Sequence, residues 1–133
     1  MLDDSRKSLA IYRSEKAAEC YAAAKMAYDN DSLPTAINRS YYCIFHAMRA
    51  VLSLESFDSA KHSGIISVFR QHYIKTGIFT VELSDIIERA FKMRNKSDYD
   101  DFFVISREDV IQQIEDAKVF LEAVEAHIKP IDS

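Results

Sequence analysis

The sequence predicts an all-α protein that forms a single domain over residues 1–133. This length is usual for one compact domain, and no repeat, linker or low-complexity segment interrupts it. Only two glycines and two prolines occur, far too few for the many tight turns of a multi-stranded β-protein. Residues that favour helices are abundant, and apolar residues recur with helical spacing in five stretches, so we expect five helices.

A short polar turn separates the first two predicted helices. Residues 4–28 carry alanine and tyrosine at steps of three, four and seven, which is typical of one helical face. The turn at residues 29–32 ends this helix. Ser32 is expected to cap the second helix and Pro34 suits its first turn, after which helical spacing continues to Leu52.

The second helix is predicted to carry three lines of side chains and to leave little surface for open water. The first line is apolar and belongs to the core: Ile37, Tyr41, Ile44, Phe45, Met48, Val51 and Leu52. The second contains only small residues, which let another helix approach closely: Ala36, Ser40, Cys43, Ala47 and Ala50. The third is polar: Arg39, Tyr42, His46 and Arg49, with Asn38 beside it. We expect this helix at the centre of the bundle or of a subunit interface, and a homodimer would cover the small-residue line.

The third helix is expected over residues 59–76, and Gly77 is placed to end it in the left-handed conformation. Thr80 is expected to cap a fourth helix that runs to about Arg94. Residues 95–105 fit neither helical nor strand spacing, so they predict a partly ordered loop.

The fifth helix begins where residues 106–109 resemble a capping box. Apolar residues then follow helical spacing until Pro130 ends the regular structure. The five helices together account for most of the chain.

Several broad classes of protein find no support in this sequence. The formal net charge of −4 argues against a protein that coats nucleic acid through bulk positive charge, but it leaves room for a local basic groove. Cys20 and Cys43 show no CxxC spacing, so neither a disulfide framework nor a zinc site is predicted. No secretory-type start and no long uncharged apolar stretch occur, so we expect a cytoplasmic protein without a membrane span.

Metal and cofactor chemistry also lack their usual residues. Only Gly64 and Gly77 are available, so no Gly-rich phosphate loop is present. No histidine has a glutamate three residues before it, the spacing that a di-metal helical bundle needs. Cys43 and His46 lie three residues apart, which without an orienting third group indicates packing rather than a nucleophile. The sequence therefore predicts no metal ion and no cofactor.

The polar line of the second helix is the first candidate site. Two cations and an imidazole on a mostly buried helix need partners. One interpretation is structural: Arg39 and Arg49 pair with acidic residues of neighbouring helices, and His46 is a satisfied interior histidine. The other is a polar pocket for a nucleotide or phosphate, because arginine binds phosphate in a bidentate manner. We expect Arg39 and His46 to face inward or to face a cleft.

The second candidate site is the segment at residues 94–99, where basic residues give way to acidic ones. A structural interpretation is a helix C-terminus followed by an Asx-type turn. Alternatively, the segment presents functional groups on a scaffold. In that case Arg94 supplies charge for a phosphate, Asn95 offers a polar contact, and Tyr99 stacks on a base.

Three segments of the chain form a pattern of recognisable order and spacing: residues 36–46 (AINRSYYCIFH), residues 61–69 (KHSGIISVF) with 75–77 (KTG), and residues 94–99 (RNKSDY). This pattern resembles that of the small HEPN proteins of bacteria and archaea. The first string is fairly specific, and the five-helix order covers nearly the whole chain.

This resemblance implies an up-and-down helical bundle that forms a homodimer and associates with a minimal nucleotidyltransferase encoded beside it, in a toxin–antitoxin-like module. Tyr99 could then offer its hydroxyl for modification by the nucleotidyltransferase. Several HEPN branches are toxins whose ribonuclease site is an arginine followed, after four to six residues, by histidine. Two subunits contribute to one RNA-cleaving cleft in those toxins.

This sequence departs from the ribonuclease pattern. After Arg94 the histidine would stand at one of positions 99–101, and these positions carry tyrosine and two aspartates. A metal-independent ribonuclease needs a general acid or base near neutrality, which imidazole supplies and an ordinary exposed carboxyl does not. We therefore favour nucleotide or RNA binding over cleavage. In the endonuclease alternative Arg94, Asp98 and Tyr99 are the candidate catalytic residues, and Asp98 must move a proton. The third alternative is a non-catalytic structural dimer.

Overall fold

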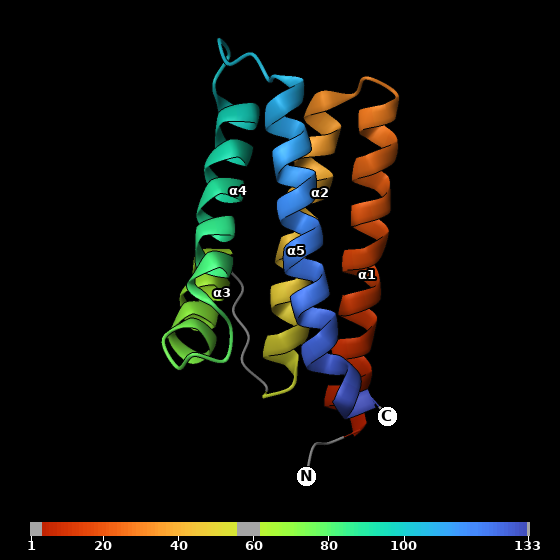
Figure 1. Cartoon of the computed structure of the whole chain (residues 1–133), viewed down its shortest axis with the longest axis vertical. Coiled ribbons are helices and arrows are strands. Elements are labelled where there is room, and N and C mark those ends of the chain that lie inside the picture. The colour runs from red at the N-terminus through yellow and green to blue at the C-terminus, as the bar shows by residue number, and fades with distance from the viewer. Residues whose placement is uncertain (1–3, 56–61, 133) are drawn as a thin grey trace.

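The computed structural model describes residues 4–55 and 62–132, most of which belong to helices (Figure 1). In chain order these are α1 (Asp4–Asp29), α2 (Leu33–Ser53), α3 (His62–Phe69), a π-helical turn η1 (Arg70–Ile74), α4 (Val81–Tyr99) and α5 (Arg107–Asp132). These residues contain no strand, so the predicted all-α class with five helices is confirmed. The four long helices run up and down the long axis of the molecule (Figure 1). None of the described helices has both the length and the apolar character that a membrane span requires.

α2 is the central helix, because α1, α3, α4 and α5 all contact it. Its small-residue line is completely buried, as expected, but against helices of the same chain. Cys43 Sγ lies 3.9 Å from the carbonyl oxygen of Ala117 in α5, and the Gln113 side-chain amide donates to Ser40 Oγ at 2.7 Å. α5 therefore supplies the cover that we expected from a second subunit, and this line does not support a homodimer.

The helix starts differ in how they are capped. Ser32 and Thr80 stand at the N-cap positions of α2 and α4, but neither side chain makes a capping hydrogen bond. Ser32 Oγ instead donates to Thr35 Oγ1 at 2.9 Å. The Ser106 hydroxyl does accept the Asp109 backbone N–H at 3.0 Å, which confirms the predicted cap of α5.

The third predicted helix is replaced by α3 and the π-helical turn η1, and its predicted start at Ser59 lies outside the described residues. The Lys75 N–H donates to the Arg70 carbonyl at 3.0 Å, the five-residue step of a π-helix. Tyr73, within the turn, is buried and its ring centroid lies 5.5 Å from that of Phe69. Gly77 has a φ of 80°, which confirms the predicted left-handed residue beyond this segment.

α4 is longer than predicted, since it runs to Tyr99 rather than ending near Arg94. Residues 95–98 contain no glycine or proline to stop the helix. Arg94 Nε lies 3.4 Å from Asp98 Oδ2, a favourable pair one turn apart, and Lys96 suits the negative end of the helix dipole. The expected loop at residues 95–105 is therefore confined to the residues after Tyr99, and residues 94–99 are helical.

Arg89 and Asp116 tie α4 to α5. The Arg89 guanidinium donates two hydrogen bonds to the Asp116 carboxylate, from Nε at 3.0 Å and from Nη2 at 3.1 Å. The Gln112 amide donates a third at 2.9 Å. Asp116 is buried, so these bonds replace the water that its charge would otherwise attract.

Candidate functional site

The polar line of α2 lies between two neighbouring helices. On one side Arg39, His46 and Arg49 line a cleft that α2 forms with α1. On the other side Tyr42, together with its neighbour Tyr41, contacts Arg94 of α4. The fold thus joins the two candidate sites of the sequence, which are more than forty residues apart in the chain, along one face of α2.

Arg94 is held against α2 by two aromatic rings and one carboxylate. Its guanidinium carbon lies 5.0 Å from the ring centroid of Tyr41 and 5.7 Å from that of Tyr42, within the range of cation–π attraction. Asp98 forms an ion pair with the same guanidinium, with its Oδ2 at 3.4 Å from Arg94 Nε. Burial raises the pKa of the Tyr41 phenol, and the Arg94 charge opposes part of that rise. Arg94 is therefore an oriented cation rather than a freely moving one.

The rest of the 94–99 segment points in several directions because it is helical. Asn95 is half-buried, whereas Tyr99, the last residue of α4, is 75% exposed. Residues five apart on a helix are separated by about 140° around its axis, so Tyr99 does not share a side of the helix with Arg94. The structure brings Arg94 and Asp98 together and leaves the Tyr99 hydroxyl accessible to another molecule.

His46 comes close to the same aromatic group. Its ring centroid lies 6.0 Å from that of Tyr42, whose ring also contacts Arg94. Spacing on one helix predicts that His46 lies near Tyr42, but it could not predict that Tyr42 also contacts Arg94, which belongs to another helix. The His62 side chain, a second histidine that sequence alone could not place relative to Arg94, lies outside the described residues.

The cleft between α1 and α2, which we call the α1–α2 cleft, has a volume of about 640 Å³. Besides the three residues of α2, it is lined by Tyr12, Arg13, Lys16, Glu19 and Cys20 of α1. Burial raises the pKa of the Cys20 thiol, and the nearby Arg39 guanidinium opposes that rise, so Arg39 reaches across the cleft toward α1. Of the described residues that line the cleft, only Glu19 is acidic.

The residues that α1 contributes to this cleft were not among the candidates predicted from the sequence. Arg13 and Lys16 lie three residues apart on α1, which places them on one side of the helix. One Arg13 Nη donates to Ser53 Oγ at 2.8 Å and to the Arg49 carbonyl at 3.4 Å. Lys16 Nζ lies 3.4 Å from a Glu19 carboxylate oxygen and 5.5 Å from the Tyr12 ring centroid. The spacing was visible in the sequence, but not which neighbour this side of α1 would meet.

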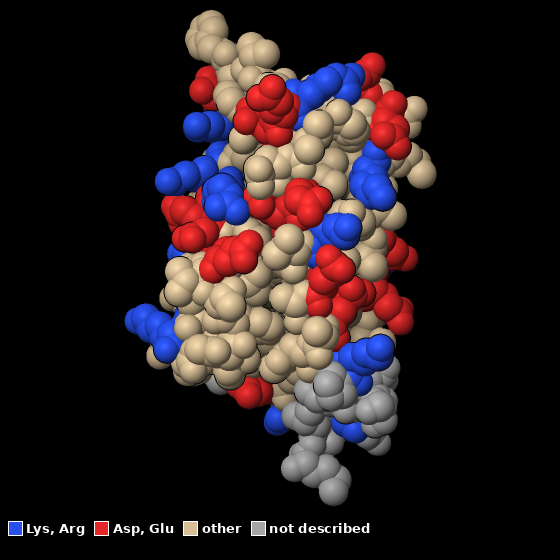
Figure 2. Space-filling view, in the orientation of Figure 1, with Lys and Arg blue, Asp and Glu red and all other residues tan. Residues whose placement is uncertain are grey.

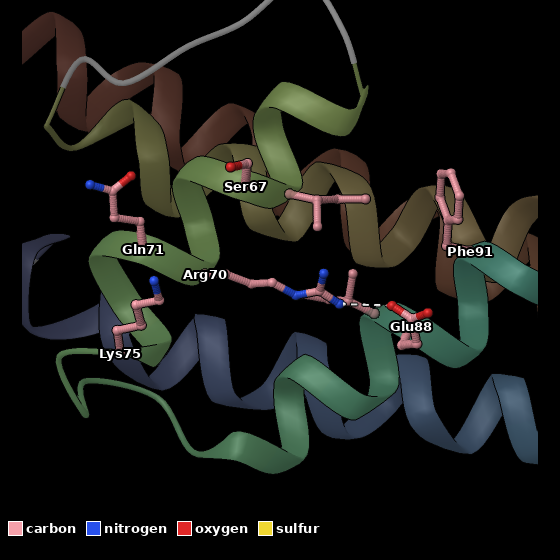
Figure 3. A pocket seen from close by; sticks show the side chains of 8 residues that line it. Ser67, Arg70, Gln71, Lys75, Glu88 and Phe91 are labelled. Atoms are coloured by element: carbon pink, nitrogen blue, oxygen red, sulfur yellow. Dashed lines mark hydrogen bonds and ion pairs between the residues drawn. The ribbon is translucent and has the colours of Figure 1, made fainter.

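A further cleft, of about 480 Å³, lies between the α3–η1 segment and α4 (Figure 3). Its central cation is already paired, because Arg70 donates to Ser84 Oγ and to a Glu88 carboxylate oxygen, each at 3.1 Å. The hydrogen bond from Arg70 lowers the pKa of the Glu88 carboxyl. None of the residues that form the two candidate sites of the sequence lines it, so this cleft is the weaker candidate.

The surface charge elsewhere is mixed. Lysine and arginine alternate with aspartate and glutamate over the face formed by α4, α5 and α1 (Figure 2). Among the described residues, no group of three or more His, Cys, Asp or Glu is placed to hold a metal ion. Burial raises the pKa of the fully buried Cys43 thiol, as suits a packing residue rather than a nucleophile.

Comparison with known proteins gives consistent matches. The family model described as the HEPN domain matches residues 11–127. A UPF0332 protein of Thermotoga maritima is 31% identical, over 96% of this chain and 97% of that protein. Two proteins of Methanocaldococcus jannaschii are each 29% identical. One, named "Putative toxin MJ0142", matches over 86% of this chain and 78% of its own length, and the other, named "Putative toxin MJ0605", over 88% and 87%.

Proposed function

The chain belongs to the HEPN domain family, and from this we propose that it is a toxin-like HEPN protein that binds nucleotide or RNA. We further propose that it works with a minimal nucleotidyltransferase, as one half of a toxin–antitoxin-like module. The names of the two archaeal relatives support the toxin-like role. The observation that carries the binding proposal is Arg94, a cation oriented by Asp98 and two tyrosine rings beside the polar line of α2.

In this proposal each polar residue has a specific part. Arg94 pairs with a phosphate and keeps its geometry because Asp98 holds its Nε edge. Tyr42 offers a ring on which a base can stack, and Asn95 offers a polar contact. The binding face continues along α2 through its remaining polar residues, which are Asn38, Arg39, His46 and Arg49.

The nucleotidyltransferase would act on Tyr99, whose phenol stands exposed at the end of α4. In this step the phenol oxygen attacks the α-phosphate of a nucleoside triphosphate and a new phosphate ester forms. The bond to pyrophosphate breaks, pyrophosphate leaves, and the phenol proton passes to a base of the transferase. The modification would add a negatively charged group to the helix that carries Arg94.

We expect Arg94→Ala to weaken RNA binding by about tenfold to a hundredfold, the range of a charge-assisted hydrogen bond in a partly buried site. Anisotropy titration of a labelled single-stranded RNA, without added metal, measures the effect. Lys92→Ala is the matched control, because Lys92 is an exposed cation of the same helix that pairs with Glu88. It should bind almost like the unaltered protein.

Incubation of the protein with the same RNA, again without added metal, tests the endonuclease alternative. His46 favours this alternative, since its imidazole lies near the ring that contacts Arg94. RNA cleavage that is lost in both Arg94→Ala and Asp98→Asn would contradict the binding-only proposal. Binding that weakens in Arg94→Ala, with no cleavage by the unaltered protein, would support it.

We also propose the homodimer that family membership suggests, although the small-residue line of α2 does not provide its interface. The loop between α4 and α5 projects from one end of the bundle (Figure 1) and exposes Phe102 and Val104 by 94% and 84%. A subunit interface would bury such side chains. Light scattering at micromolar concentration should give the mass of two chains, and Phe102→Asp should shift it toward one. A single-chain mass for the unaltered protein, with or without RNA, would exclude the dimer.

A further inference from the structure

We infer that the α1–α2 cleft is a site for the sugar–phosphate backbone of single-stranded RNA, with Tyr12 as a stacking platform at its edge. This inference rests on the proposed function and makes it more specific. It names the form of the nucleic acid and assigns a role to residues of α1, which are absent from the binding face described so far.

The first support is the charge of the cleft. Arg39 and Arg49 stand on its α2 wall, and Arg13 and Lys16 stand on its α1 wall. The whole chain has a formal net charge of −4, so this concentration of cations runs against the overall balance. A concave site in which one sign of charge predominates, as cations do here over the single carboxylate of Glu19 among the described lining residues, attracts the opposite charge. The partner is therefore anionic.

The second support is the shape of the cleft. Arg39 and Arg49 are ten residues apart on one helix, which spaces them by about 15 Å. Cations spread over this length suit successive phosphates of a strand better than the phosphate group of one small nucleotide. The cleft also lies between two directly packed helices, whose axes are typically about 8–10 Å apart. The cleft is therefore a depression along the line where two helices meet, which we expect to seat one extended strand rather than a duplex.

The third support is Tyr12, which is 55% exposed and lines the cleft. Its ring centroid lies 5.5 Å from Lys16 Nζ, so an aromatic surface and a cation stand together on α1. Non-specific single-strand sites combine these two elements, because every base has a face that can stack and every nucleotide carries a phosphate. Glu19 reduces the Lys16 charge only slightly, since both side chains of that pair are well exposed.

The cleft and Arg94 belong to one continuous face. His46 lines the cleft, and its ring lies 6.0 Å from Tyr42, whose ring in turn contacts Arg94. A strand bound in the cleft can therefore continue past His46 to the oriented Arg94 cation. The cleft binds most of the length of the strand and provides most of the affinity, and Arg94 binds one phosphate of the strand beyond the cleft.

Anisotropy titrations with a labelled ten-nucleotide oligouridine, and with an RNA hairpin of matched length, test this inference. Tyr12→Ala and Arg39→Ala should each weaken oligouridine binding by about tenfold. Arg39→Ala should also reduce the slope of log affinity against log salt by about 0.7, the value for one lost phosphate contact on a single strand. The hairpin should bind more weakly than oligouridine. Lys118→Ala, which removes an exposed cation from α5, is the charge-matched control and should change neither quantity.

Thermal melts of each variant would first establish that it is folded, as expected for substitutions at exposed positions. Oligouridine affinity that is unchanged in both Tyr12→Ala and Arg39→Ala would overturn the inference, as would equal affinity for the hairpin. If Arg94→Ala still weakened binding in that case, the proposed function would stand and the cleft would have no part in it. If the unaltered protein bound neither oligouridine nor ATP, both proposals would fail.

Discussion

Replacing Tyr99 by phenylalanine is expected to abolish nucleotidyl transfer to this chain. The proposed acceptor is the phenol oxygen, and phenylalanine keeps the ring while removing the one atom that can form the phosphate ester. Tyr99 is 75% exposed at the end of α4, so the change should leave the fold and its stability intact. The intact mass of the protein, after incubation with a minimal nucleotidyltransferase of the proposed kind and a nucleoside triphosphate, measures the transfer.

Tyr21→Phe is a suitable control, because Tyr21 is a half-buried tyrosine of α1 that has no part in the proposed chemistry. It should gain the same mass as the unaltered protein. An unchanged mass gain in Tyr99→Phe would place the acceptor at another residue and remove Tyr99 from the proposal. No mass gain in any of the proteins would argue against the pairing with a nucleotidyltransferase itself.

The helical architecture could be predicted from the sequence because it depends on local patterns. Periodic alanine and tyrosine defined α1, and the Ser106 cap defined the start of α5. The extension of α4 was missed because residues 95–99 have no strong apolar period. Arg94 and Asp98 are four residues apart, the spacing of a helical ion pair, and this signal favoured helix where the basic and acidic residues suggested a turn. Tyr73, within the π-helical turn, is buried and its hydroxyl donates to the Val51 carbonyl of α2 at 3.4 Å, a contact between helices that local spacing does not show.

The two parts of the candidate site could each be predicted from the sequence, but their contact could not. The polar line of α2 and the segment after Arg94 were both visible as patterns, but the sequence could not show that Tyr42 joins them. Nor could it show which helix covers the small-residue line of α2. Either a second subunit or α5 could pack closely against these small residues. The contact of Cys43 with Ala117 shows that α5 does so. The basic residues Arg13 and Lys16 of α1 were missed for the same reason. Helical periodicity shows which residues share a side of a helix, but not which other helix that side contacts.

We expect Asp116→Ala to lower the free energy of unfolding by about 2 kcal/mol, and the melting temperature by about 6–10 °C. The carboxylate is buried and accepts hydrogen bonds from Arg89 and Gln112, so its removal leaves these donors without their acceptor between α4 and α5. Loss of one partner of a fully buried ion pair costs about 3–5 kcal/mol, but the Arg89 side chain is 51% exposed and can turn to water, which reduces the cost. Urea denaturation at neutral pH measures the change.

Glu115→Ala removes the same charge from an exposed neighbouring position of α5 and should stay within about 0.5 kcal/mol of the unaltered protein. Equal stability of the two variants would mean that the Arg89–Asp116 pair does not hold α4 against α5, and that the Arg94 face depends on the contacts of α4 with α2 for its position.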